Sequence, residues 1–184
     1  MNITRFPIPG LLLIEPKRFT DERGWFCETW QQQRYRDAGI DKPFVQDNLA
    51  KSSKGVLRGL HAQEPFAQGK LVQVFEGAVF DVAVDLRVGS PTFGKWHGIT
   101  LSGDNGLQFY VPPGFGHGYY VISDEALFAY KCTDVYSPQT QFGVRWNDPA
   151  LGIEWPLIGE PILSDKDREA PLLADIPVER FTKF

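Results

Sequence analysis

The chain has 184 residues, 42% of them hydrophobic and 23% charged, values typical of a folded domain and unlike those of disordered or fibrous proteins. The formal net charge of −4 excludes a broad basic surface for nucleic acid, but a few local arginines and lysines still suffice for a small phosphorylated ligand. No apolar run approaches the roughly 20 residues that cross a bilayer, and none is preceded by the basic segment of a signal peptide. We therefore expect one domain over residues 1–184, in the cytoplasm, with no membrane or nucleic-acid partner.

Short apolar stretches separated by glycine- and proline-rich turns recur along the whole chain and predict strands. In chain order they are Leu11–Glu15, Gly24–Thr29, Phe44–Ala50, Val56–His61, Lys70–Glu76, Ala78–Arg87, Trp96–Leu101, Gln108–Val111, Tyr119–Ile122 and Ala126–Tyr136. Two segments have helical patterns. Gln31–Ala38 ends at Gly39, a good helix stop, and Ser164–Arg168 begins with a residue suited to cap a helix.

Many short strands without alternating helices predict an all-β fold, a jelly-roll barrel or sandwich with a few short peripheral helices. Residues Lys70–Arg87 have the pattern of a β-hairpin that bends at Glu76-Gly77. Alternation along its second strand puts Asp81 and Asp85 on one face and only apolar residues on the other. The apolar face is expected to pack on the core, and the carboxylate face to line a polar cavity or face solvent.

A metal site is the first functional alternative. Pro112–His117 matches the later half of the metal motif of cupin jelly rolls, but His61 has no second histidine two positions on. Two separated histidines leave zinc or iron short of ligands, and Cys27 and Cys132 are too far apart to add a zinc or disulfide framework. We therefore expect no metal, no other cofactor and two free thiols.

The remaining polar residues suit proton transfer. His61 can be a neutral base near pH 7, and such a base needs a carboxylate to fix its tautomer. Asp167, Asp81 and Asp85 are all open candidates for that carboxylate, and Tyr130 is a candidate acid on a strand. Three of them also have a plain structural interpretation: His61 as a hydrogen-bonded histidine, Asp167 as the third residue of a helix capped by Ser164, and Tyr130 as a core aromatic.

Taken together, several motifs occur in one order from about Phe6 to Leu173, nearly the whole chain. They are Asp21–Phe26, Phe44–Asn48, Gly55–His61, Gln68–Val72, Val79–Asp85, Pro113–Gly118, Tyr130-Lys131, Trp146–Asp148, Gly152–Pro156 and Leu163–Asp167. With these motifs the chain resembles the dTDP-4-dehydrorhamnose 3,5-epimerase family, the metal-free cupin enzymes of dTDP-L-rhamnose synthesis.

The resemblance implies a substrate and a catalytic set. The substrate is a dTDP-linked 4-keto-6-deoxyhexose, whose keto group acidifies the C–H bonds at C3 and C5. His61 is then the general base, Asp167 its orienting partner and Tyr130 the acid on the far side of the sugar. Lys70 is implied to stabilise the enolate oxygen.

The resemblance also implies binding residues and a homodimer. Substrate contacts fall on Arg23, Glu28, Gln46, Asp47, Asn48, Arg58, Lys70, His117, Tyr136, Gln141 and Lys166. Among them Tyr136 is the implied stacking partner of the thymine ring. In the dimer, a short N-terminal strand such as Leu11–Glu15 is expected to pair across subunits and cover an exposed edge.

Three features depart from the family pattern. Gln141 stands where many members have a nucleotide-contacting glutamate, Ala62 replaces an aromatic residue, and Gly116-His117-Gly118-Tyr119 replaces the usual Ala-His-Gly-Phe. Strict alternation also puts Arg58 and His61 on opposite strand faces, which predicts either a bulge at Gly59 or an edge position for Arg58.

Other functions on the same scaffold remain open. They are an epimerase acting only at C3 or only at C5, a 3,4-ketoisomerase, and a non-catalytic protein that binds sugar nucleotides. The presence of Tyr130 favours the full epimerase over the first two, and the combination of His61, Asp167 and Tyr130 argues against a protein that only binds.

Overall fold

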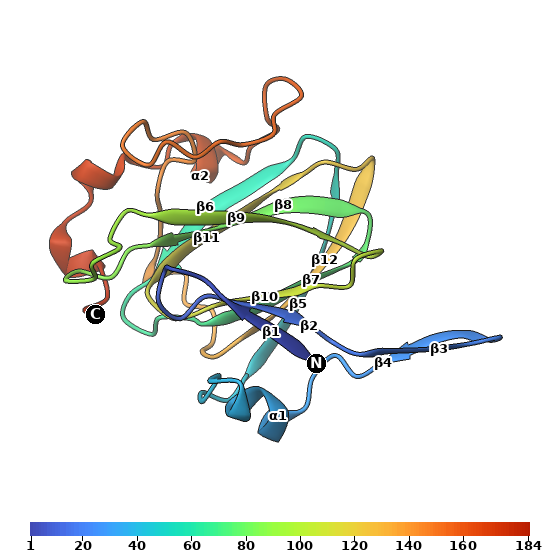
Figure 1. Ribbon diagram of the computed structural model, residues 1–184. Coiled ribbons are helices and arrows are strands. Elements are labelled where there is room, and N and C mark those ends of the chain that lie inside the picture. Colours follow the sequence, from blue (N-terminus) through green and yellow to red (C-terminus); the bar gives the residue numbers. More distant parts are fainter.

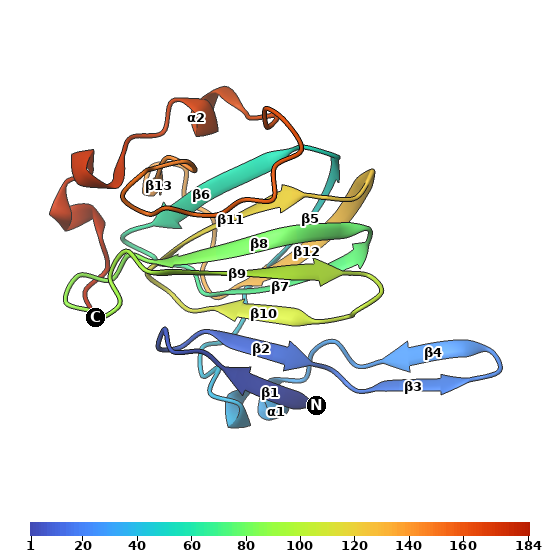
Figure 2. The same ribbon diagram turned by 45° about the horizontal axis from the view of Figure 1, so that its top comes forward.

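The computed structural model describes residues 1–184 as two facing antiparallel sheets from which a thin hairpin projects (Figures 1 and 2). The first sheet has the order β1 (Asn2–Arg5), β2 (Leu12–Glu15), β10 (Gln108–Val111), β7 (Lys70–Glu76), β12 (Glu125–Cys132) and β5 (Gln46–Ser53). The second has the order β13 (Gln141–Gly143), β6 (Leu57–Gln63), β11 (Phe115–Val121), β8 (Ala78–Asp85) and β9 (Trp96–Ser102). The all-β jelly-roll prediction is confirmed, in the form of a sandwich rather than a closed barrel.

The remaining elements lie at the periphery. Strands β3 (Arg18–Asp21) and β4 (Gly24–Cys27) form the projecting hairpin (Figure 2). Helix α1 (Gln32–Asp37) lies below the first sheet, and α2 (Asp165–Arg168) lies beside β6 (Figure 1). Two 3₁₀ turns, Leu173–Asp175 and Val178–Arg180, follow near the C-terminus. No helix has both the length and the apolar character that a membrane crossing demands.

Both faces of β8 are buried, so the apolar face packs as expected, but the expectation that the carboxylate face lines a polar cavity or faces solvent is wrong. Its apolar face packs with residues 144–181, including Leu151, Ile176 and Phe181. Its other face lies between the sheets, where Val79 and Ala83 join the largest apolar cluster. Asp81 and Asp85 lie on this same face and are fully buried, so neither faces solvent. The C-terminal segment therefore acts as a third layer over part of the second sheet.

The predicted hairpin over Lys70–Arg87 is wrong. Strand β7 pairs with β10 and β12 in the first sheet, whereas β8 pairs with β11 and β9 in the second. Between them Gly77, with a φ of +73°, carries the chain from one sheet to the other. Alternation located the two strands correctly, but the burial of an apolar face from each sheet decides which strands pair.

The expected pairing of Leu11–Glu15 across subunits is also wrong. Within one chain β2 is hydrogen-bonded on one side to β1 and on the other to β10. The outermost strands of this sheet are β1 and β5. Strands β1, β3 and β13 had not been predicted, because these short polar segments show little hydrophobic alternation.

Gly77 is a position where only glycine fits. A Cβ added there would lie 1.9 Å from the carbonyl oxygen of Glu125, whereas at Gly55, whose φ is similarly positive, it would meet nothing within 4 Å. Gly55→Ala should therefore lower the free energy of unfolding by only about 1–2 kcal/mol, the strain of a non-glycine residue in the left-handed region. Gly77→Ala should cost roughly 1–3 kcal/mol more, the usual effect of overpacking. Urea unfolding measures both, and equal losses would contradict the close approach at Gly77.

Candidate active site

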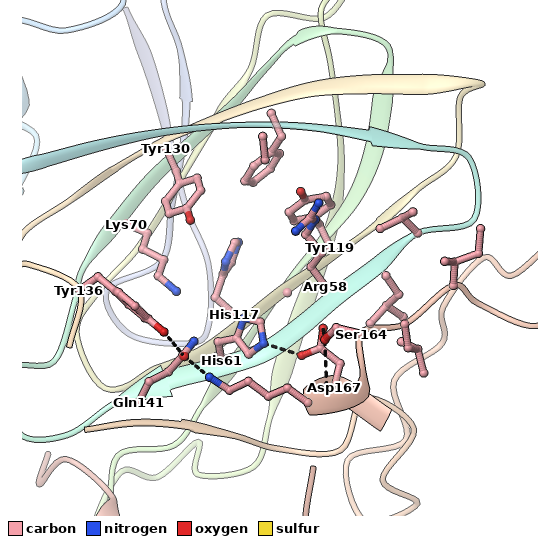
Figure 3. Close-up of a pocket in the computed structure, with 18 residues that line it drawn as sticks. Arg58, His61, Lys70, His117, Tyr119, Tyr130, Tyr136, Gln141, Ser164 and Asp167 are labelled. Carbon is pink, nitrogen blue, oxygen red and sulfur yellow. Dashed lines mark hydrogen bonds and ion pairs between the residues drawn. The ribbon is translucent and has the colours of Figure 1, made fainter. Parts of the chain in front are cut away.

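A cavity of about 540 Å³ opens between the two sheets, with α2 at its mouth (Figure 3). Its walls combine residues from both sheets and from the α2 segment. The polar residues that line it are Arg58, His61, Lys70, His117, Tyr119, Tyr130, Tyr136, Gln141, Ser164, Lys166 and Asp167. Nine of the residues predicted from the sequence are thus brought to one cavity, although they come from widely separated parts of the chain.

His61 on β6 and Asp167 on α2 form a hydrogen-bonded pair at the mouth. The His61 Nε2 lies 2.5 Å from the Asp167 Oδ1, and Asp167 is buried. An ionised carboxylate only accepts hydrogen bonds, so the Nε2 atom carries the proton and donates. The Nδ1 atom of His61 is consequently left as the basic nitrogen.

The short helix α2 fixes the position of the Asp167 carboxylate. Ser164 caps the helix, as predicted, by accepting from the Asp167 backbone N–H at 3.2 Å. Its hydroxyl also donates to Asp167 Oδ2 at 2.8 Å. Burial alone raises the pKa of Asp167, but the hydrogen bond and charge of His61, the Ser164 hydroxyl and the Gly59 backbone N–H outweigh it and hold the pKa below its ordinary value. Asp167 is therefore ionised at neutral pH.

A second histidine–aspartate pair lies deeper in the cavity. The His117 Nε2 is 3.0 Å from both oxygens of Asp81, and both side chains are buried. Burial lowers the pKa of His117, despite the opposing effect of Asp81, so the ring is neutral at pH 7. The pKa of Lys70 is lowered by burial as well, against the raising effects of Cys132 and Asp81. Asp81, one of the three carboxylates left open by the sequence, thus partners His117 and not His61.

Tyr130 faces the histidines from the opposite wall. It lies on β12 of the first sheet, whereas His61 and His117 come from the second sheet (Figure 3). Burial is the main cause that raises the pKa of Tyr130 above its ordinary value. The phenol therefore keeps its proton at neutral pH. Tyr119, which stands where the family usually has phenylalanine, adds a second phenol to the cavity.

A bulge in β6 brings Arg58 and His61 to the same cavity. The register of β6 against β11 shifts between the pairs Tyr119–Arg58 and His117–His61. Gly59 lies in this shift with a φ of +115°, and a Cβ there would come within 2.6 Å of both the Gly118 Cα and the His117 carbonyl oxygen. The alternative of a bulge at Gly59 is thereby confirmed, and two glycines allow the strands to approach.

Three side chains gather at the outer end of the cavity (Figure 3). The Gln141 Oε1 atom accepts from the Tyr136 hydroxyl at 3.0 Å and from the Lys166 ammonium. Both donors use the amide oxygen, which leaves the Gln141 N–H groups facing no acceptor among these partners. This end of the cavity thus combines an exposed aromatic ring, a cation and an amide donor.

Five predicted binding residues lie outside this cavity. Arg23 is at the tip of the β3–β4 hairpin in an ion pair with Asp21, and Glu28 pairs with Arg34. The other three lie on β5, which is an edge strand: Asp47 bonds Lys131, Asn48 donates to Cys132, and Gln46 accepts from the Tyr136 backbone N–H. Within one chain, therefore, these residues do not surround the same space as His61.

The acidic side chains nearby offer no metal-binding cluster. No group of three or more His, Cys, Asp or Glu residues is placed to hold a metal ion. His61 and His117 each have an aspartate as a ring partner instead.

The low pKa of Asp167 makes a prediction for stability. Ionised Asp167 stabilises the fold fully above its unfolded pKa of about 4, and this contribution is lost as the pH falls through the lower folded pKa. The difference in unfolding free energy between the wild type and Asp167→Asn should therefore shrink below about pH 4. Urea unfolding at a series of pH values tests this, and a difference independent of pH would be inconsistent with the hydrogen-bonded carboxylate.

Comparison with known proteins gives one consistent family. The profile of the dTDP-4-dehydrorhamnose 3,5-epimerase family matches residues 5–175. The protein of that name from Neisseria gonorrhoeae is 53% identical over 91% of this chain, and the chain spans about half (51%) of its length. A structure of the Legionella pneumophila dTDP-6-deoxy-D-glucose-3,5-epimerase in complex with dTDP-4-keto-L-rhamnose superposes with a TM-score of 0.97 at 53% identity, covering 100% of this chain and 98% of that one.

One relative bears on the number of carbons inverted. A dTDP-4-dehydrorhamnose 3-epimerase from Streptomyces niveus is 43% identical over 95% of this chain and 85% of its own length. The fold is thus shared by enzymes named for one centre and for two. On the extent of the family match and the identity of its relatives, this chain belongs to the dTDP-4-dehydrorhamnose 3,5-epimerase family.

Proposed function

We propose that the chain epimerises dTDP-4-dehydro-6-deoxy-D-glucose at C3 and C5 to give dTDP-4-dehydro-L-rhamnose. The observation that carries the proposal is a base and an acid on opposite walls of one cavity. His61, held by Asp167, belongs to one sheet, and Tyr130 belongs to the other. Inversion at carbon needs this arrangement, because the proton must leave one face of the sugar and return to the other.

Proton removal is assigned to the His61 Nδ1 atom. Because Nε2 is bonded to the ionised Asp167, the imidazolium formed on proton transfer stays next to a negative charge. The C–H electrons move into the C3–C4 or C5–C4 bond, and the C4 carbonyl becomes an enolate. A positioned base of this kind contributes typically about 10²–10⁴-fold to the rate.

Stabilisation of the enolate oxygen is assigned to Lys70. Its ammonium is half-buried in the cavity wall, and a hydrogen bond to a developing negative charge is stronger there than in bulk water. A preorganised donor to an oxyanion is worth roughly 3–4 kcal/mol. The neutral ring of His117, held by Asp81, lies close by and adds no competing positive charge.

Reprotonation is assigned to Tyr130. Because its pKa is raised by burial, the phenol carries a proton at neutral pH and can deliver it to the carbon from the face away from His61. The enolate electrons then re-form the C4 carbonyl. His61 and Tyr130 return to their starting states by proton exchange with solvent, so a second carbon can react in the same way.

The diphosphate and the thymine base of the substrate are assigned to the outer half of the cavity. Arg58 and Lys166 supply positive charge for the diphosphate, and guanidinium suits bidentate contacts to phosphate oxygens. Tyr136 offers an exposed aromatic face on which the thymine ring can stack, and Gln141 an amide donor beside it.

Replacing the base gives a direct test of this mechanism. His61→Asn keeps a polar side chain but cannot take a proton, so turnover should fall by about 10²–10⁴-fold while dTDP affinity stays within a few-fold. The rate is measured by trapping the product with the downstream reductase, and affinity by calorimetry. As a matched control, Lys54→Gln alters only an exposed ion pair with Asp124 and should leave both values unchanged. A near-normal rate for His61→Asn would remove this histidine from the base role.

We also propose that the chain acts as a homodimer. The projecting hairpin carries exposed Phe19, Trp25 and Phe26, and the outer face of the first sheet exposes Leu49 and Phe75. Large exposed apolar side chains on neighbouring elements suit contact with a second copy of the chain. Neither Arg23 nor Glu28 reaches the cavity of its own chain, so we assign both to the cavity of the partner.

A mixed dimer separates contacts within a chain from contacts across the dimer. In a dimer of one His61→Asn chain and one Arg23→Ala chain, one cavity has an intact base and, from the other chain, an intact arginine. If Arg23 acts across the interface, the mixture should regain activity that neither variant has alone. No recovery after verified subunit exchange would show that Arg23 does not act in the partner's cavity.

A further inference from the structure

The stretch that carries Tyr136 is held in place by glutamine side chains. It connects β12 to β13, and its backbone at residues 134–137 is not part of either sheet. The Gln68 Nε2 donates to the Asp134 carbonyl at 2.8 Å, and the Gln46 Oε1 accepts from the Tyr136 N–H at 2.8 Å. Four consecutive residues of the stretch are in fact bonded to glutamines, the other two contacts being made by Gln63.

Gln63 makes more of these bonds than the other two glutamines. Its Nε2 donates to the carbonyl of Val135 at 3.0 Å and to that of Phe66 at 2.7 Å, and its Oε1 accepts from the Ser137 N–H at 2.8 Å. Gln63 is only 6% exposed, so these bonds are shielded from competing water. One side chain thus ties the segment after β6 to residues on both sides of Tyr136.

The ring of Tyr136 has few other restraints. It is 49% exposed, and its hydroxyl has a single hydrogen-bond partner, Gln141. Its backbone is fixed by Gln46 from the first sheet and, through its two neighbours, by Gln63 from the second. The place of this ring at the mouth of the cavity therefore depends on amide side chains from both layers of the sandwich.

We propose that Gln63 is a positioning residue that holds Tyr136 as the stacking wall for the nucleobase of a nucleoside diphosphate-sugar. This inference rests on the proposed function, because that function places a base on Tyr136. Gln63 does not line the cavity and does not act on the reacting carbons. It raises ligand affinity because it holds the Tyr136 ring in the position that stacks on the base. Binding therefore costs little conformational entropy.

Gln63 tests this idea better than its two companions. The family resemblance implies a substrate contact for Gln46 itself, and the Gln68 bond reaches only Asp134, at the start of the stretch. The two bonds from Gln63 to Val135 and Ser137 flank Tyr136 directly. A change at Gln63 should therefore move the ring without removing a group that touches the ligand.

Two substitutions remove the bonds in different ways. Gln63→Glu puts a carboxylate oxygen against the carbonyls of Phe66 and Val135, and Gln63→Met removes all three bonds at similar length. Both should weaken dTDP binding by about tenfold, within the range expected for loss of an aromatic stacking partner. Both should raise KM similarly and leave kcat within about twofold, because the catalytic pair is untouched.

A double-mutant cycle shows whether the effect passes through Tyr136. Tyr136→Ala alone should weaken dTDP binding, and adding Gln63→Glu or Gln63→Met to it should change the affinity by less than about twofold. If the full loss at Gln63 persists without the Tyr136 ring, the proposed route is wrong. This readout excludes a general structural role, which would lower affinity equally in both backgrounds.

A measurement without ligand completes the test. Amide hydrogen exchange of residues 133–140 should be faster in both Gln63 variants, whereas exchange in β7 and β8 should not change. Ser90→Ala serves as the stability control, because it removes a buried hydrogen bond to Asp85 outside the cavity and should lower Tm with no effect on affinity.

The possible failures are distinguishable. A wild-type chain that binds no dTDP would overturn both the proposed function and this inference. Wild-type binding with unchanged affinity and unchanged exchange in both Gln63 variants would overturn only the role of Gln63.

Discussion

The 2.5 Å hydrogen bond between His61 and Asp167 joins residues 106 positions apart, and the other features of the site follow from the need to form it. The bond fixes which ring nitrogen is basic and keeps a negative charge beside the imidazolium. On one side, the bulge of β6 at Gly59 brings Arg58 and His61 to one cavity, and the Gly59 backbone N–H bonds the Asp167 carboxylate. On the other side, α2 must begin at Ser164 so that the Asp167 carboxylate is held by the helix cap.

The two-sheet sandwich places the His61–Asp167 pair opposite an acid. Two sheets with apolar inner faces leave a polar cavity only where β6, β11, β7 and β12 carry histidine, lysine and tyrosine in place of aliphatic residues. Because the walls belong to different sheets, the base and the acid are separated by the width of the cavity, and a sugar ring between them is exposed on both faces. Burial then sets the protonation of each group: it keeps His117 neutral and Tyr130 protonated, while hydrogen bonds keep Asp167 ionised.

Much of the fold was predictable because alternation and turn residues are local signals. The bounds of β7 and β10 agree with the predicted strands. A regular strand would put Arg58 and His61 on opposite faces, and this conflict led to the bulge as one of two predicted alternatives. Pairing was not predictable: the Lys70–Arg87 segment alternates like a hairpin, yet its strands belong to different sheets. The partner of His61 could not be chosen among three aspartates either, because only the folded chain brings α2 to β6. The hydrogen bonds of Gln63 could not be predicted from the residues around it, since its partners are backbone atoms of a distant segment.

The central claim is that one cavity removes and returns protons at two carbons of a 4-keto sugar. Proton NMR of dTDP-4-dehydro-6-deoxy-D-glucose with the enzyme in D₂O tests it most directly, because solvent deuterium marks each carbon that has been deprotonated. The account predicts deuterium at both C3 and C5, in the product trapped by the downstream reductase. Deuterium at one carbon alone would contradict the two-centre reaction and identify a single-centre epimerase. No deuterium at either carbon, with dTDP still bound, would contradict catalysis altogether and leave a protein that only binds sugar nucleotides.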